Sequence, residues 1–232
     1  MRKLGIIQPG RLGDIIICLP IAKYYFDQGY KVIWPVLNEY YNTFRDIDYV
    51  TAISLDCDIN DSVFRAKSIL NSINCKQLDL SFGFLHSSAA GYHSNIDYAK
   101  NFVEAKYKLS DVPLRERWNL YFSRDKQREY SLYEKMVKSP DYILAHENSS
   151  QGHHFFADGN NIIKVVPFED FNIFNWMKII ENAQEIHCVD SSICNLIESQ
   201  KHLKDKIKKY IPAKRFAVDW GRTTLENNWQ IL

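Results

Sequence analysis

Two short turns, one near each end of the chain, carry residue types that could bind phosphate. The first, PGRLGD at 9–14, follows the apolar run 4–7 and precedes an apolar stretch at 15–26. The second, VDSS at 189–192, follows the apolar-rich run 185–189. Free backbone amides at a helix start attract anions, and glycine lets a ligand approach the backbone closely. Each turn is therefore a candidate site for nucleotide phosphates.

Both turns also have a purely structural interpretation. Asp14, and the Asp190-Ser191-Ser192 group, are good helix caps whatever else they do. The first turn lacks the Gly-x-Gly-x-x-Gly spacing of dinucleotide folds and the Gly-Lys-Ser/Thr of a P-loop. Phosphate binding and simple capping therefore both stay open at this point.

The elements around the first turn predict a β-α-β unit and hence a parallel sheet. Strands are expected at 4–7 and 31–36, with a helix at 15–26 that Pro20 should kink or delay. The pattern then repeats more loosely. Further helices are expected at 39–45, 61–74 and 94–108, and further strands at 49–55 and 77–82.

A second α/β series follows the break at Ser139-Pro140. Strands are expected at 142–146, 161–166, 185–189, 207–211 and 215–218, and helices at 126–137, 174–183 and from the second turn to Gln200. The predicted fold class is therefore α/β, with two Rossmann-like lobes, each built on a parallel sheet, and a cleft between them. The first lobe is residues 1–138 and the second is residues 139–232.

Composition limits the function classes. Of the 232 residues 46% are hydrophobic and 14% aromatic, which is enough for a substantial core, and 29 Lys and Arg nearly balance 28 Asp and Glu. That balance argues against a protein that coats nucleic acid. No apolar run reaches the roughly 20 residues of a membrane span, and no secretory signal is visible, so we expect a cytoplasmic protein. The five scattered cysteines predict reduced thiols and no zinc site.

The segment GRLGDIIICLPIA at 10–22 resembles the N-terminal motif of the heptosyltransferases, glycosyltransferase family nine, which carry Leu-Gly-Asp and then an apolar run to Leu-Pro. The turn at 189–192 resembles their C-terminal Asp-Ser/Thr-Gly loop, and Ser149-Ser150 is similar to their hydroxyl pair at the start of the second lobe. The resemblance implies a GT-B fold of two lobes. It also implies that Asp14 is the general base on the acceptor hydroxyl.

The resemblance further implies that Ser149, Ser150, Ser191 and Ser192 hold the donor diphosphate. The family has a Lys four residues after its hydroxyl pair, where this chain has His153-His154, so a histidine is the expected phosphate partner here. Ser192 stands where the family has Gly. The chain is also shorter than the family norm, so we expect trimmed loops and C-terminal helices.

Glu169 and the adjacent histidines His153 and His154 are further candidate ligand-binding residues. Glu169, after a predicted strand, could bind the donor ribose, although a solvated loop explains it as well. Adjacent histidines on a strand point apart, so His153 and His154 form no chelating pair for a metal. The complete set of expected donor-binding residues is Gly10, Arg11, Gly13, Ser149, Ser150, His153, His154, Glu169, Asp190, Ser191 and Ser192.

The expected function is inverting transfer of a sugar from a nucleotide-sugar to the hydroxyl of a saccharide or other acceptor. The nucleotide-sugar is a co-substrate, and no metal or other cofactor is expected. Two alternatives remain. One is a non-catalytic module that binds a nucleotide-sugar. The other is a glycosyltransferase acting on modified nucleic-acid bases, which would use the lysine-rich run 201–214 and the aromatic-basic stretch 115–128.

Overall fold

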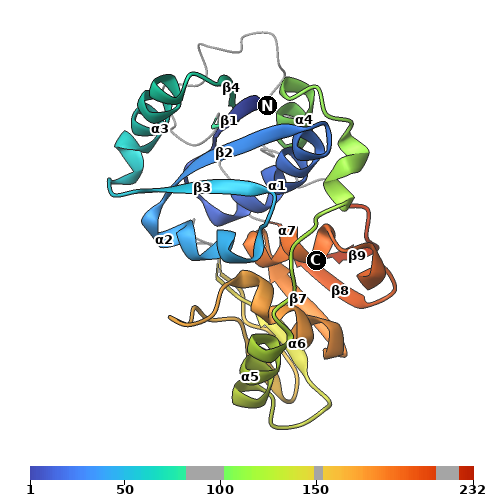
Figure 1. Ribbon diagram of the computed structural model, residues 1–232. Helices are drawn as coiled ribbons and strands as arrows, with labels where there is room; N and C mark the ends of the chain where they lie inside the picture. Colours follow the sequence, from blue (N-terminus) through green and yellow to red (C-terminus); the bar gives the residue numbers. More distant parts are fainter. Residues whose placement is uncertain (82–101, 149–153, 213–224) are drawn as a thin grey trace.

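The structure is a computed structural model that describes residues 1–81, 102–148, 154–212 and 225–232. Two separate parallel sheets lie one above the other in Figure 1, each with its own helices. The first sheet has the strand order β3-β2-β1-β4 and the second the order β6-β5-β7-β8-β9. The predicted α/β fold with two parallel sheets is confirmed.

The first sheet and its helices come from the N-terminal half of the chain. Its strands are β1 (Arg2–Ile7), β2 (Tyr30–Leu37), β3 (Val50–Leu55) and β4 (Lys76–Asp79). Its helices are α1 (Leu12–Asp27), α2 (Asn38–Tyr41), η1 (Asn42–Asp46), α3 (Ile59–Ile73), α4 (Phe102–Leu109) and η2 (Leu114–Trp118).

The second sheet and its helices come from the C-terminal half. Its strands are β5 (Ile143–His146), β6 (Ile162–Lys164), β7 (Glu185–Val189), β8 (Ile207–Ile211) and β9 (Trp229–Ile231). Its helices are α5 (Lys126–Met136), η3 (Ile173–Trp176), α6 (Met177–Asn182), α7 (Ser192–Glu198) and η4 (Lys201–Leu203).

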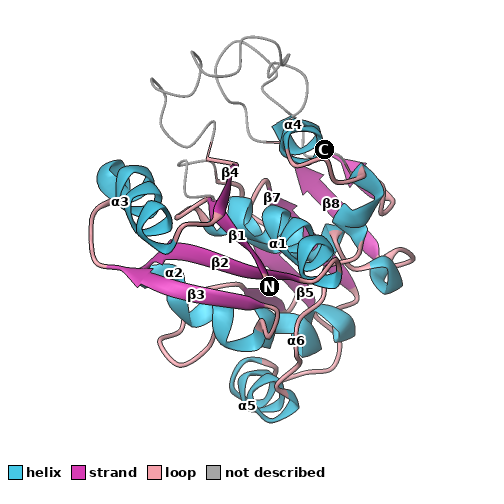
Figure 2. Cartoon of the chain, turned by 45° about the horizontal axis from the view of Figure 1, so that its top comes forward, coloured by secondary structure: helices cyan, strands magenta, loops and turns pink. Residues whose placement is uncertain are grey.

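Helices α1 and α3 cover opposite faces of the first sheet (Figure 2). Helix α1 is buried along most of its length and belongs to the main hydrophobic core. The helix begins at Leu12 and includes Pro20, so the delayed start expected from that proline is not observed. The amphipathic helix α3 packs on the other face, where a Cβ on Gly5 of β1 would lie only 2.6 Å from Leu70 Cδ2. A larger residue at this crossing would force Leu70 to move.

The two lobes share one continuous core. The main cluster of buried apolar side chains includes members of both sheets, and α1 packs against α7. The Phe122 and Phe174 rings stack with their centroids 4.2 Å apart. Asn172 Nδ2 donates to Asp46 Oδ2 at 2.7 Å, which joins the loop before η3 to η1. The contacts fix the two strand-to-helix turns relative to each other.

The lobe boundary at 138/139 stays a prediction. Helix α5 precedes that boundary but packs against α6 and η3 of the second sheet. Arg124, just before α5, pairs with Glu129 and Glu181 and so ties the helix to α6. This helix therefore lies with the second lobe.

One local expectation differs from the structure, and two others fall wholly or partly outside the described residues. Helix α3 begins at Ile59, before the expected start at 61, and is capped by Asp58, which accepts from Asn60 N at 2.7 Å. The last strand of the second sheet is β9, while the predicted strand 215–218 lies outside the described residues. The first part of the helix expected at 94–108 also lies outside them. No helix in the described ranges is long and apolar enough to cross a membrane.

Candidate active site

The first turn is held by a buried glutamine. Gln8 follows β1, is fully buried, and donates from Nε2 to Gly10 O at 2.9 Å. Trp34 Nε1 donates to Gln8 O at 2.9 Å, which ties the same residue to β2. Arg11 then adopts φ 59°, a conformation that non-glycine residues seldom take. This strained turn lets α1 begin at Leu12 and places the Gly10–Gly13 backbone at the carboxyl end of the sheet.

Asp14 is the third residue of α1 and does not cap it. The N-cap position is Arg11, and no side chain makes a capping hydrogen bond there. The Asp14 side chain is 19% exposed, and its Oδ1 lies 3.3 Å from Nζ of Lys106 on α4. The purely structural interpretation of Asp14 as a helix cap is therefore wrong. Its carboxylate instead faces a buried cation on one side.

The second turn is built around Ser191. Its Oγ accepts from Cys194 N at 3.4 Å and so caps α7. His146, at the end of β5, places Nδ1 2.7 Å from the same Oγ. Burial lowers the pKa of His146 to about 4, so the imidazole is neutral at physiological pH. His146 can orient the Ser191 hydroxyl, but it contributes no positive charge.

The structure brings the two turns together across the lobes, with α1 above α7 in Figure 1. A Cβ placed on Gly13 would lie 3.4 Å from Asn195 Nδ2 and 3.7 Å from Ser192 N. Asn195 Nδ2 donates to Ser191 O at 3.1 Å, and its Oδ1 accepts from Arg117 Nη2 at 3.2 Å. Residues predicted from opposite halves of the chain thus meet at one place.

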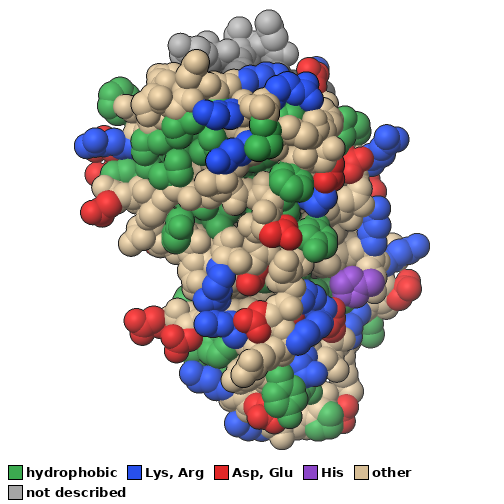
Figure 3. All heavy atoms as spheres, viewed as in Figure 1, with side chains coloured by type: hydrophobic (Ala, Val, Ile, Leu, Met, Phe, Trp, Pro, Cys, Tyr) green, Lys and Arg blue, Asp and Glu red, His purple; other side chains and the backbone are tan. Residues whose placement is uncertain are grey.

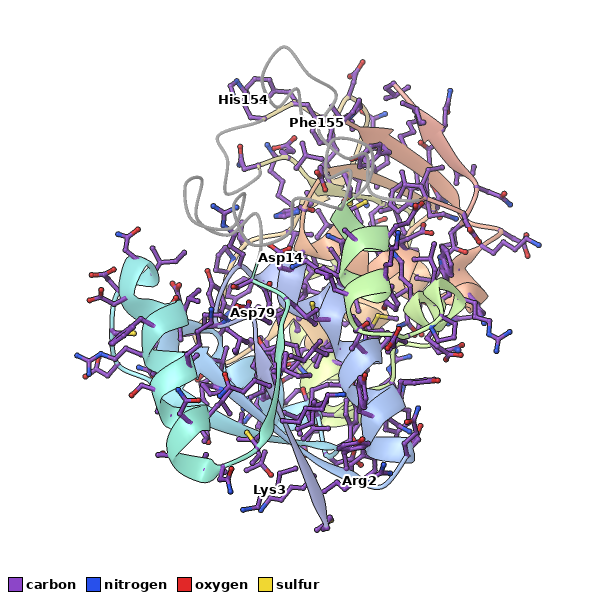
Figure 4. All side chains as sticks on the ribbon, turned by 90° about the horizontal axis from the view of Figure 1, so that it is seen from above. Arg2, Lys3, Asp14, Asp79, His154 and Phe155 are labelled. Carbon is purple, nitrogen blue, oxygen red and sulfur yellow. The ribbon has the colours of Figure 1, made fainter. Side chains whose placement is uncertain are left out.

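A second carboxylate, Asp79, lies on the same edge of the first sheet. It pairs in register with Ile7 of β1. Figure 4 shows Asp14 and Asp79 at one end of the sheet and Arg2 and Lys3 at the other. Burial alone would raise the pKa of Asp79, but hydrogen bonds from Lys67 and Ser81 and the Lys67 charge outweigh it and lower the pKa. Both Asp79 oxygens are used by these partners, so Asp14 is the better placed base.

The other predicted donor residues are distributed unevenly. Ser149, Ser150 and His153 lie outside the described residues. His154 is exposed and forms a bridge with Asn148; Figure 4 shows it apart from Asp14. Glu169 is exposed in the loop after β6, where the carbonyl of the adjoining Asp170 accepts from Arg128 of α5. The structure therefore groups Gly10, Arg11, Gly13, Asp14, Asp190, Ser191 and Ser192, and leaves Glu169 on the α5 side of the lobe.

The described residues offer no metal centre at the two turns, and the surface hollow lies elsewhere. Within the described ranges, no group of three or more His, Cys, Asp or Glu side chains is arranged to hold a metal ion. A hollow of about 390 Å³ lies on α5 and the loop after β6. Its lining is polar, with Asp125, Arg128 and Asp170 among its residues, and it contains no residue of either turn. The two facing turns remain the candidate active site.

No protein-family model matches the sequence, and no curated protein matches it at a significant level. Solved structures do match over the whole chain. A glycosyl transferase family 9 protein from Veillonella parvula DSM 2008 aligns at 7% identity and TM-score 0.62 over 85% of its own length. E. coli ADP-heptose lps heptosyltransferase II aligns at 8% identity and TM-score 0.62 over 90% of its length.

The chain has the GT-B fold of these glycosyltransferases. E. coli heptosyltransferase WaaC with ADP-2-deoxy-2-fluoro heptose also aligns, at 12% identity and TM-score 0.51 over 93% of its length. The likeness to the heptosyltransferases that the motif at 10–22 indicated is thus confirmed at the level of the fold.

Proposed function

We propose that this protein is an inverting glycosyltransferase that moves a sugar from a nucleotide-sugar to an acceptor hydroxyl, with Asp14 as general base. The observation that carries the proposal is the position of Asp14. It stands at the carboxyl edge of the first sheet, partly exposed, one residue after the glycine that approaches the Ser192 amide of the other lobe. A base on one lobe and anion-binding groups on the other are the two components that a single displacement needs.

The leaving group is a nucleoside diphosphate, whose negative charge must be taken up as the sugar departs. The second turn offers the Ser191 hydroxyl and the Ser192 amide, and the first turn offers the guanidinium of Arg11. Ser149, Ser150 and His153 remain predicted donor contacts. ADP-sugars are the first donors to test, because the matched E. coli proteins are described with ADP-heptose or its fluoro analogue.

In the proposed reaction the acceptor O–H bond breaks and its proton passes to Asp14. The acceptor oxygen forms a bond to the anomeric carbon from the face opposite the diphosphate. The bond from that carbon to the phosphate oxygen breaks, and the nucleoside diphosphate leaves with the electron pair. A single displacement of this kind inverts the anomeric configuration, which NMR of the product can read directly.

Two measurements test this function. A thermal-shift screen over nucleoside diphosphates and nucleotide-sugars finds the donor, because a ligand that binds only the folded state raises Tm by mass action. Release of labelled sugar or nucleotide from the best donor then separates an enzyme from a binding module. Binding without any turnover, with water or with a panel of saccharide acceptors, would overturn the enzymatic proposal.

The alternative of a base-modifying enzyme gains no support from the lysine-rich run. Four of its lysines are engaged within the chain: Lys201 with Asn119, Lys206 with Ala183 O, Lys208 with three carbonyls and Lys209 with Glu185. On the face drawn in Figure 3, basic and acidic side chains are interspersed. A surface of mixed sign gives little attraction for a phosphate backbone.

A further inference from the structure

We infer that Lys106 is a positioning residue for Asp14, a role that rests on the proposed function. The buried Lys106 ammonium holds Oδ1 of the carboxylate and leaves Oδ2 to take the acceptor proton. Lys106 does not touch substrate in this account. It acts on the reaction only through the base.

The ammonium lies where three elements converge. Lys106 belongs to α4 and is fully buried. Its Nζ donates to Gln8 Oε1 at 2.8 Å, at the start of the first turn, and to Leu80 O at 2.5 Å, just after β4. Asp14 Oδ1, on α1, lies 3.3 Å away. The ammonium thus donates two hydrogen bonds and forms an ion pair with Asp14.

The arrangement restrains both the base and the turn beside it. Gln8 accepts from Lys106 through Oε1 and donates through Nε2 to Gly10 O, so one side chain connects the ammonium to the glycine turn. Among the residues that the structure describes, no donor is bonded to Asp14 Oδ2. A carboxylate held at one oxygen keeps the other oxygen in a defined direction. Small displacements of a reacting group lower rates steeply, on the order of 10²-fold for about 1 Å.

A second buried lysine in the same chain shows what a purely structural role looks like. Lys208 is 1% exposed, and its Nζ donates only to backbone carbonyls, those of Leu203, Lys204 and Lys206. Both ammonium groups offset the cost of burying a charge with hydrogen bonds. Of these two lysines, only Lys106 contacts a carboxylate at the proposed active site. Lys208 is therefore the matched control.

The test compares Lys106→Met, Lys208→Met, Asp14→Asn and the double variant Lys106→Met/Asp14→Asn with the parent protein. We expect Lys106→Met to lower kcat by about 10- to 100-fold while the donor KM stays within about 2-fold. Lys208→Met should lower Tm but keep kcat within about 2-fold. In the Asp14→Asn background, adding Lys106→Met should change kcat no further, because the base through which Lys106 acts is already gone.

Two outcomes overturn the inference. One is a Lys106→Met enzyme whose kcat matches that of Lys208→Met. The other is a double variant in which the two losses in kcat multiply. If Lys106→Met does not fold, Lys106→Gln replaces it, since an amide keeps donors for Gln8 and Leu80 without the charge, and the same kcat criteria apply. Full activity in Asp14→Asn would instead overturn the proposed function itself, so the two failures are distinguishable.

Discussion

Replacement of Glu198 by Gln should destabilise the protein strongly, although Glu198 lies outside the candidate active site. The side chain is fully buried on α7. Its Oε1 accepts from Trp118 Nε1 and Glu226 N, both at 2.7 Å, and its Oε2 accepts from Trp229 Nε1 at 2.8 Å. One carboxylate therefore joins η2, α7 and the strand β9.

The loss of stability in Glu198→Gln can be worked out from the three N–H groups that donate to the carboxylate. In Glu198→Gln the amide oxygen can replace Oε1, but the amide nitrogen then faces the Trp229 N–H, donor against donor. A lost hydrogen bond to a charged group costs about 1.5–3 kcal/mol, and the donor left unpaired adds its own desolvation cost. We therefore expect the free energy of unfolding to fall by about 2–4 kcal/mol. Glu198→Leu, which removes the acceptor of all three donors, should cost more.

Urea unfolding followed by tryptophan fluorescence measures these changes. Glu134→Gln, an exposed side chain on α5, is the control and should stay within about 0.5 kcal/mol of the parent protein. Adding Trp229→Phe to Glu198→Gln should recover about 1 kcal/mol relative to the sum of the single changes, because the opposed donor is removed. A Glu198→Gln protein as stable as the parent, or strictly additive single changes, would refute the reasoning.

Two more predictions concern acid stability and the glycine turn. Burial tends to raise the pKa of Glu181, but the bonds and charge of Arg124 outweigh it and lower the pKa. The unfolded state then binds more protons, so this stabilisation is full above the unfolded-state pKa and is lost as the pH falls through the lower folded-state value. The free energy of unfolding, measured with urea across that acid range, should depend less on pH in Arg124→Met than in the parent protein. The same pH dependence in both proteins would contradict this. Gly13→Ala meets only ordinary contacts of 3.4–3.8 Å, so its stability should be equal or up to about 1 kcal/mol higher. Its affinity for nucleoside diphosphate, measured by calorimetry, should fall; an unchanged affinity would place the ligand elsewhere.

Local patterns predicted most of the fold and both turns. The strand-turn-helix pattern around 9–14 and 189–192 depends on neighbouring residues only, and the structure has a strand before and a helix after each turn. The strand β9 was missed because Trp229–Ile231 is short and pairs with a strand about 20 residues away, which no local periodicity reveals. The helix start at Ile59 was misplaced because several acidic residues nearby are equally good caps.

Local sequence patterns do not predict the residues that surround Asp14 and the second turn. Lys106 bonds to Gln8, which is 98 residues distant in the chain, and amphipathic spacing assigns a lysine to the solvent-facing side of a helix. The available signal was weak: Lys106 is flanked by Ala105 and Tyr107, and both are buried in the structure. His146 and Asn195 also act through contacts between separate elements, which spacing alone does not predict.

The most direct test of the central claim is the turnover of Asp14→Asn with the donor that gives the largest thermal shift. Asp27→Asn is the matched control, because Asp27 is the exposed last residue of the same helix. We expect Asp14→Asn to stay folded and to keep a donor Kd within about 2-fold while kcat falls by about 10²-fold or more. Asp27→Asn should keep kcat near the parent value. A folded Asp14→Asn protein that retains most of the parent kcat would contradict the central claim.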